Sequence, residues 1–148
     1  MERKLRWYIG MSAYDFIAAD KKLKTIELGV ETNGHNIIIQ NEDYVLGIYN
    51  DEASSYTEPF TNLPSIVNVQ IGDFDNVKTE LFNYVKDAMR ENDTLEIWST
   101  WVGETDDIEK KTMYEENMTV EDLRWVLGRN NSDHPRCLKV YKWTRGKK

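Results

Sequence analysis

Short runs of alternating apolar and polar residues recur along the chain and predict β-strands. Residues 4–10 show this alternation, which has the two-residue period of a half-buried strand. Residues 36–40 and 44–49 are rich in strand-forming residues and are separated by a polar triplet, so we expect them to pair as a hairpin. Asn33-Gly34 predicts a turn just before them. Later segments with strand character are 66–71, 94–102 and 136–143.

A longer period, with an apolar residue every three to four positions, predicts a helix over residues 75–91. Asp73 or Asp75 can cap its first turn, because an aspartate side chain accepts hydrogen bonds from the free amides at a helix start. The apolar stripe of this helix is expected to face a core.

Two shorter segments begin with a capping box, in which a Ser or Thr is followed three residues later by an acid. Thr119 and Asp122 open a helix that Gly128 closes. Ser12 and Asp15 have the same spacing, so the apolar residues after them are expected to continue as a short helix.

The expected order of elements is β-α-β-β-β-α-β-α-β, in which strands and helices do not strictly alternate. This order favours an α+β fold with a mainly antiparallel sheet of about five to six strands and about two to three helices on one face. Residues 50–64 and 103–118 are expected to be irregular. No linker or repeat divides the chain, so residues 1–148 are expected to form a single domain with a flexible basic tail at 144–148.

Composition narrows the class of protein. With 148 residues, 40% of them apolar and 11% aromatic, the chain has the make-up of a globular domain. One cysteine and two histidines are too few for a disulfide framework or a structural zinc site, and no cofactor is predicted. No apolar run approaches the length of a membrane span, and the first residues lack the apolar core of a secretion signal. We therefore expect a cytoplasmic protein that does not enter a membrane.

A nucleophile and a base lie close together in the sequence at Asp133, His134 and Cys137. The favoured interpretation is structural, with two turn residues followed by a buried strand cysteine. No glycine-rich phosphate-binding motif is present. A binding function is therefore favoured over an enzymatic one, which stays open.

Charge is distributed unevenly along the chain. Residues 1–24 carry +3 and residues 124–148 carry +7, so a total of −7 leaves −17 for residues 25–123. The densest acidic stretch is 104–122. Such a field steers association with a basic partner, although an ordinary solvated surface has the same signature. Direct binding of nucleic acid is disfavoured despite the basic tail, because the acidic middle of the chain would repel phosphates.

Strand alternation places several aromatic rings on the same side as charged residues. Trp98 shares a strand face with Glu96, Tyr141 shares one with Lys139, and Tyr8 lies among basic residues. If these strands are neighbours, one face of the sheet is aliphatic and the other mixes rings with charges, which is typical of recognition surfaces. Alternatively, a loop such as 50–64 or 103–118 covers this second face, and the rings form a second small core.

These features favour an intracellular protein-binding module, of the inhibitor or immunity/antitoxin type, that docks a basic protein partner. The alternatives are a small-molecule-binding or enzymatic domain with an aromatic-lined pocket, and an accessory subunit. The residues expected to contact the partner come from the strands and from the acidic stretch: Tyr8, Glu96, Trp98, Tyr141, Trp143, Glu104, Asp106, Asp107, Glu109, Glu115 and Glu116.

Overall fold

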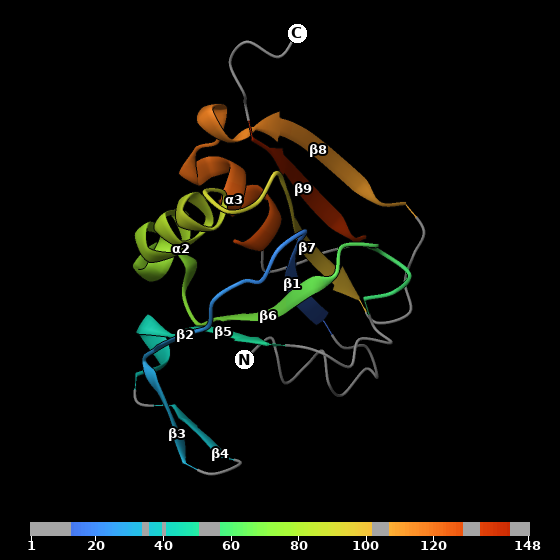
Figure 1. Ribbon diagram of the computed structural model, residues 1–148. Helices are drawn as coiled ribbons and strands as arrows, with labels where there is room; N and C mark the ends of the chain where they lie inside the picture. Colours follow the sequence, from blue (N-terminus) through green and yellow to red (C-terminus); the bar gives the residue numbers. More distant parts are fainter. Residues whose placement is uncertain are drawn as a thin grey trace, which may run out of the picture.

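The computed structural model describes residues 13–33, 36–39, 41–50, 57–101, 107–128 and 134–142. These residues form a seven-stranded sheet, two α-helices, two short 3₁₀ helices and a separate two-stranded hairpin (Figure 1). The strands are β1 (Ala13–Ala19), β2 (Ile26–Leu28), β3 (Val30–Asn33), β4 (Asn36–Ile39), β5 (Leu46–Asn50), β6 (Ser65–Ile71), β7 (Thr94–Trp101), β8 (Glu109–Tyr114) and β9 (Arg136–Tyr141). The helices are η1 (Glu42–Tyr44), α2 (Phe74–Ala88), η2 (Glu115–Asn117) and α3 (Val120–Leu127).

The strands of the main sheet lie in the order β2-β5-β6-β1-β7-β9-β8. Neighbouring strands run antiparallel except β8 and β9, which are parallel. The α+β class, the mainly antiparallel sheet and the helices on one face are therefore confirmed, and the main sheet has seven strands rather than the predicted five to six. Within the same residues, no helix is long and apolar enough to span a bilayer.

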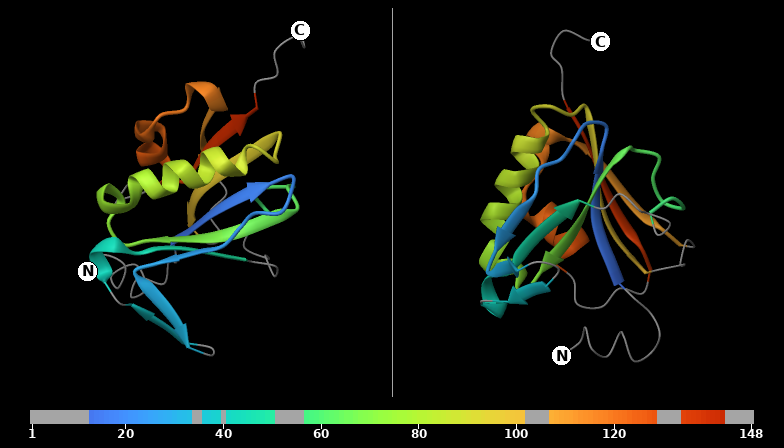
Figure 2. Two further views of the ribbon diagram at one scale, coloured as in Figure 1. Left: turned by 60° about the vertical axis from the view of Figure 1, so that its left-hand side comes forward. Right: turned by 60° about the horizontal axis from the view of Figure 1, so that its bottom comes forward.

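Both α-helices cover the same face of the sheet (Figure 2). The core beneath them contains Ile17, Ile97 and Leu138, which are register partners across β1, β7 and β9 and are fully buried. From the helices, Leu81 and Leu123 pack into the same cluster and are also fully buried. The apolar stripe that the helical period predicts therefore faces this core.

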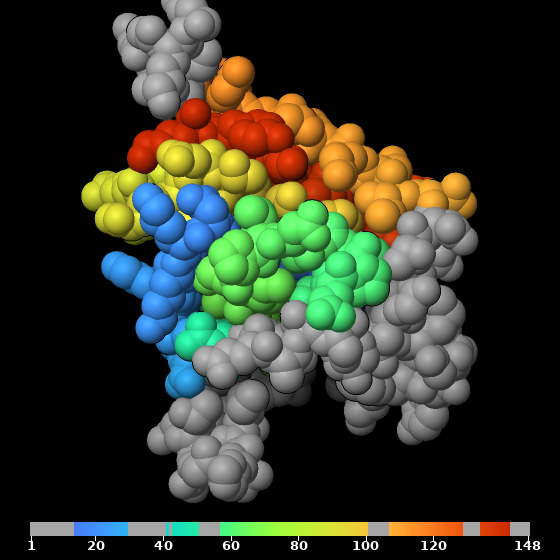
Figure 3. All heavy atoms as spheres, turned by 45° about the vertical axis from the view of Figure 1, so that its right-hand side comes forward, coloured from blue at the N-terminus to red at the C-terminus, as the bar shows by residue number. Residues whose placement is uncertain are grey.

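A second, smaller core lies on the other face of the sheet. Phe16, Trp98 and Cys137 are register partners on this face, and each is at most 1% exposed. The irregular segment 57–64 covers them with Phe60 and Leu63. In Figure 3 the green atoms of residues 57–71 fill the middle of this side of the molecule. The central strands are therefore buried on both faces.

Two of the three predicted helix starts are confirmed. The Asp73 side chain accepts a hydrogen bond from the backbone N–H of Asp75 at 3.0 Å and caps α2. Thr119 and Asp122 form the reciprocal capping box of α3, and Gly128 follows the last turn. At these two ends the local capping signals agree with the tertiary packing, because both helices bury their apolar side chains in the main core.

The helix predicted after Ser12 is wrong, because β1 occupies these residues. The four residues from Phe16 to Ala19 are all fully buried, two on each face of the sheet. A strand buried on both faces reads as a continuous apolar run, which has neither the period of a strand nor that of a helix. Pairing with β6 and β7 therefore overrides the local capping signal.

The hairpin predicted between residues 36–40 and 44–49 is also wrong. β4 pairs with β3, and β5 pairs with β2 and β6. Between them the Asn41 side chain accepts a hydrogen bond from Asp43 N–H and starts η1, which redirects the chain. Gly34 of the turn predicted at Asn33-Gly34 lies outside the described residues, and beside it Asn33 of β3 pairs with Asn36 of β4.

The segment 103–118, predicted as irregular, contains the edge strand β8. Most of its residues are exposed, so it has no apolar face to signal a strand. Parallel pairing with β9 holds it in the sheet. The predicted strand at 4–10 and the flexible tail at 144–148 lie outside the described residues.

We predict that Trp98→Ala destabilises the protein by about 3–5 kcal/mol, because it removes the centre of the second core. The Trp98 ring stacks on Phe16 with centroids 5.9 Å apart and lies 5.3 Å from the Phe60 ring. Urea unfolding followed by far-ultraviolet circular dichroism measures the loss. Tyr44→Ala is the control, since Tyr44 is 53% exposed. Equal effects of both substitutions would show that segment 57–64 does not cover Trp98.

Candidate functional site

The residues expected to contact a partner divide between two sides of the molecule. Glu96, Trp98 and Tyr141 belong to the second face of the sheet, as their register positions show. Glu115 lies beside α2, because its carboxylate binds Lys86 Nζ at 2.8 Å. Strand aromatics and acidic residues therefore do not form one surface. Four of the expected contact residues lie outside the described part of the chain: Tyr8, Glu104, Asp106 and Trp143.

Glu96 and Trp98 are held within the second face and do not present a free recognition surface. The indole Nε1–H of Trp98 donates a hydrogen bond to Glu96 Oε1 at 3.0 Å. Lys139 Nζ lies 3.7 Å from Glu96 Oε2 and 5.4 Å from the centroid of the Tyr141 ring. Glu96 is 8% exposed and Trp98 is 1% exposed. At Trp98 the structure therefore has the alternative in which a loop covers the second face and the rings form a second small core.

Besides Glu96, two of the expected contacts in the acidic stretch already bind basic side chains. Glu109 accepts hydrogen bonds from His134 and from Arg136 Nε, and these bonds hold the pKa of the Glu109 carboxyl below its ordinary value. Glu115 pairs with Lys86. Glu116 and Asp107 are exposed, and no ion pair joins Glu116 to another described residue. The acidic stretch therefore offers a partner fewer free carboxylates than its sequence suggests.

Further exposed acids lie on the outer surface of α2, where the sequence-based site had none. Asp73, Glu80 and Asp87 are seven residues apart, so they share one side of the helix and are about 10 Å apart along its axis. Glu91 follows beyond the helix end, and it too is exposed. The signal that could have found them is the helical period itself, read on the polar side of the predicted helix rather than on the apolar side.

These acids belong to a layer that carries a net negative charge. Residues 73–93 and 115–128, which form α2, η2, α3 and their flanks, contain ten carboxylates and four bases. Their balance of −6 compares with −7 for the whole chain. We call the solvent-facing side of these residues the acidic helical surface. The second face of the sheet, by contrast, has Glu96 balanced by Lys110 and Lys139.

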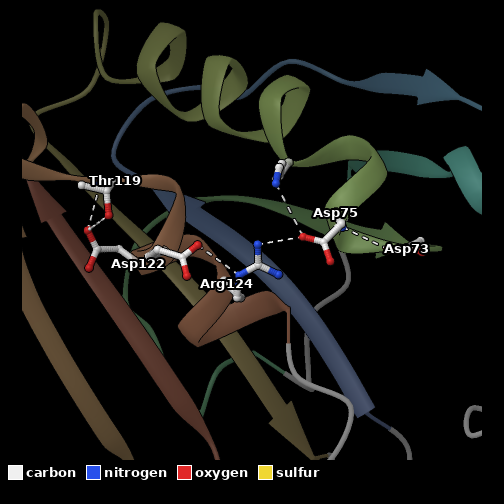
Figure 4. Close-up of polar contacts among 7 residues, drawn as sticks. Asp73, Asp75, Thr119, Asp122 and Arg124 are labelled. Atoms are coloured by element: carbon white, nitrogen blue, oxygen red, sulfur yellow. Dashed lines mark hydrogen bonds and ion pairs between the residues drawn. The ribbon is translucent and has the colours of Figure 1, made fainter.

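An ion pair between Asp75 and Arg124 joins the two helices at this surface (Figure 4). The Asp75 carboxylate of α2 lies 2.7 Å from the Arg124 guanidinium of α3, and Arg124 Nε lies 3.1 Å from Glu121. The Asp75 pKa is lowered, first by the hydrogen bond from Arg124. The geometry of the acidic helical surface is therefore set by contacts between the helices rather than by each helix separately.

Asp122 links the start of α3 to the edge strand. Burial raises the pKa of its carboxyl, but hydrogen bonds from Lys111 and from the backbone and hydroxyl of Thr119 outweigh burial and lower it overall. Lys111 Nζ and the Arg136 guanidinium both lie over the Trp125 ring, at 5.7 and 4.8 Å from its centroid. These contacts connect β8 and β9 to α3 and stabilise the fold.

Catalysis by the Asp133, His134 and Cys137 group is not supported. Cys137 is fully buried in the second core, and burial raises the pKa of its thiol to about 12. His134 binds Glu109 instead. A thiolate is the reactive form of cysteine, so this thiol is inert in the folded protein. Asp133 lies outside the described residues.

An open depression of about 880 Å³ lies where segment 57–66 meets the ends of β1 and β5. Two of its polar side chains are bound to backbone amides, and the first, Asp20, accepts hydrogen bonds from the N–H groups of Asp93 and Thr94. Ser65 likewise accepts one from Leu23 N–H. Among the described residues, no group of three or more His, Cys, Asp or Glu side chains is arranged to hold a metal ion. The depression therefore has the features of a turn region rather than of a reaction site.

We predict that Cys137 resists a thiol-specific chromogenic reagent in the native protein at pH 8 and reacts at once in denaturing urea. Burial and a high thiol pKa both suppress the native reaction. The rate of absorbance increase measures it, with free cysteine as the reference. Rapid native labelling would contradict the burial of this strand and restore Cys137 as a candidate nucleophile.

We predict that Asp122→Asn lowers the free energy of unfolding by about 1 kcal/mol at pH 7, because it removes the charge from the capping box. The folded-state pKa of Asp122 is lowered, so its stabilisation is present above its ordinary pKa of about 3.9 and is lost as pH falls through the lowered value. The difference between wild type and variant should therefore shrink in urea titrations at low pH. Glu91→Gln serves as the control. A pH-independent difference would contradict this role.

No protein-family model, curated protein or solved structure matches this chain. A function is therefore inferred from its side-chain geometry.

Proposed function

We propose that this protein is an intracellular protein-binding module, of the inhibitor or immunity/antitoxin type, that docks a basic protein partner through its acidic helical surface. The observation that carries the proposal is the set of exposed carboxylates on the helical layer, among them Glu80 on α2, Glu91 after its end and Glu116 on η2. Glu80, Glu91 and Glu116 make no ion pair with any described residue, so their charge is available to a partner.

Electrostatics gives this surface a physical role. Fields of one sign attract a partner of opposite sign and raise its association rate by about 10- to 1000-fold at low ionic strength. The four bases of the layer are already close to acids: Lys78 to Asp75, Lys86 to Glu115, Arg90 to Asp87 and Arg124 to Asp75 and Glu121. A basic partner would therefore meet the acids of the layer that make no ion pair with a described residue, namely Glu80, Glu91 and Glu116.

The surface is also rigid enough to select a partner by shape. α2 is anchored by residues such as Leu81 and Val85, which are fully buried, and the ion pair from Asp75 to Arg124 holds α3 against it. A preformed surface loses less conformational entropy on binding than a flexible one. The proposal therefore places the contact on helices, with the strand aromatics in a supporting core.

The enzymatic alternative has less support. Cys137 is buried, and the Asp20 carboxylate of the open depression accepts hydrogen bonds from backbone amides. An aromatic-lined pocket would need the rings on the second face to line a cavity, whereas Phe16, Phe60 and Trp98 pack against each other.

The test begins with capture of the partner from a native lysate at low and high salt, followed by identification and purification of that partner. We predict that Glu80→Lys with Glu116→Lys slows its association by about tenfold or more at low salt. Dissociation should change less. Stopped-flow mixing of the purified proteins measures both rates.

The matched control is Glu27→Lys with Glu58→Lys, which makes the same change in net charge at exposed residues outside the acidic helical surface. The proposal requires the control to retain most of the wild-type association rate. Equal slowing by both double variants would mean that only net charge matters, and an unchanged rate for the first would show that the acidic helical surface is not the docking site.

A further inference from the structure

The hairpin of β3 and β4 is a sheet of two strands that stands apart from the main sheet (Figure 1). Gly29, between β2 and β3, has a positive φ of 71°, which lets the chain turn away from the direction of β2. β3 and β4 pair along their length, and the structure describes no third strand beside either of them. Because a two-stranded hairpin is marginally stable alone in water, it gains stability from a further strand.

The outer edge of β4 lacks the devices that protect the other edge strands of the described sheets. Open edges are normally kept short or carry charged residues, which discourage pairing with another chain. β2 has only three residues, β8 contains Lys110 and Lys111, and β3 contains Glu31. β4 is an asparagine followed by three isoleucines, Asn36–Ile39, with no charged residue, proline or glycine. Such a sequence has a high strand propensity and nothing that opposes pairing.

Charge and symmetry favour a second copy of this chain as the strand that pairs there. Each copy has a net charge of −7, so two copies approach with least repulsion where the contact strand is uncharged. Antiparallel pairing of β4 with itself about a two-fold axis places Ile37 opposite Ile38 of the second copy, and the reverse. The strand is therefore self-complementary, with no like charges opposite one another. A partner selected by charge finds no charge on β4 to recognise.

We propose that β4 pairs with β4 of a second copy, so that the two hairpins join into one continuous antiparallel sheet. Two exposed apolar residues, Leu28 at 38% and Tyr44 at 53%, lie at the base of the hairpin, where Asn41 N–H donates a hydrogen bond to the carbonyl oxygen of Gly29 at 3.1 Å. The paired strands are short, so the association is weak and depends on protein concentration. This contact uses no residue of the acidic helical surface and does not depend on the proposed function.

Sedimentation equilibrium of the full-length protein, over a concentration series from micromolar to millimolar, measures the association. We expect the average mass to rise from that of a monomer toward that of a dimer. Hydrogen exchange at the amides of residues 36–39 should become slower over the same series, and this measurement needs no variant. A monomer at every concentration would overturn the proposal, and so would a dimer whose exchange slows elsewhere and not at residues 36–39.

A variant of β4 tests the contact directly. Ile37→Lys with Ile38→Lys would place each introduced lysine opposite another in the paired strands, so we expect this protein to remain monomeric. The matched control is Thr25→Lys with Thr112→Lys, which adds the same charge at exposed residues outside the hairpin and should dimerise like the wild type. Circular dichroism checks that both variants keep the fold. Dimerisation of the β4 variant, or loss of the dimer in both variants, would contradict pairing through β4.

Discussion

Burial of β1, β7 and β9 on both faces is the constraint on which the rest of this structure depends. Ile17, Ile97 and Leu138 lie under the helices, and Phe16, Trp98 and Cys137 occupy the other side at the adjacent register. Burying a large apolar side chain stabilises the folded state by about 1.5–3 kcal/mol. Strands with such residues on both sides therefore require a layer on each side of the sheet.

The two layers are chemically different, and this difference bears on function. Two regular helices cover one face and present carboxylates to solvent, whereas the irregular segment 57–64 covers the other with Phe60 and Leu63. The rings of the second face thus hold the sheet together, and the surface proposed for docking lies on the helices. The second face becomes polar toward the start of β7 and the end of β9, where Glu96, Lys139 and Tyr141 follow the aromatic cluster.

Local signals made much of the fold predictable. α2, α3, β6, β7 and β9 each carry their own periodicity or caps, and Asp73, Thr119 and Asp122 cap where their spacing indicates. β1 and β8 could not be predicted in this way. β1 is apolar on both faces and β8 is exposed along most of its length, so neither shows the alternation of a half-covered strand.

The candidate site was predictable only in its chemistry. The acidic middle of the chain is evident from the sequence, and so is the shared strand face of Glu96 and Trp98. Which acids are free depends on residues far away in sequence, as Glu109 with His134 and Glu115 with Lys86 show. Whether Trp98 is covered depends on a segment about 40 residues earlier, and no local pattern encodes that contact.

Hydroxyl-radical footprinting read by mass spectrometry tests the central claim most directly, because it reports side-chain accessibility in the whole protein. Tyr44 and Tyr114, 53% and 45% exposed, are internal references for fast oxidation, and fully buried Phe16 is the reference for slow oxidation. A sheet covered on both faces predicts that Trp98 is oxidised as slowly as Phe16, after allowance for intrinsic reactivity. Oxidation of Trp98 at the rate of the exposed tyrosines would contradict this account and return the strand aromatics to the surface as a docking site.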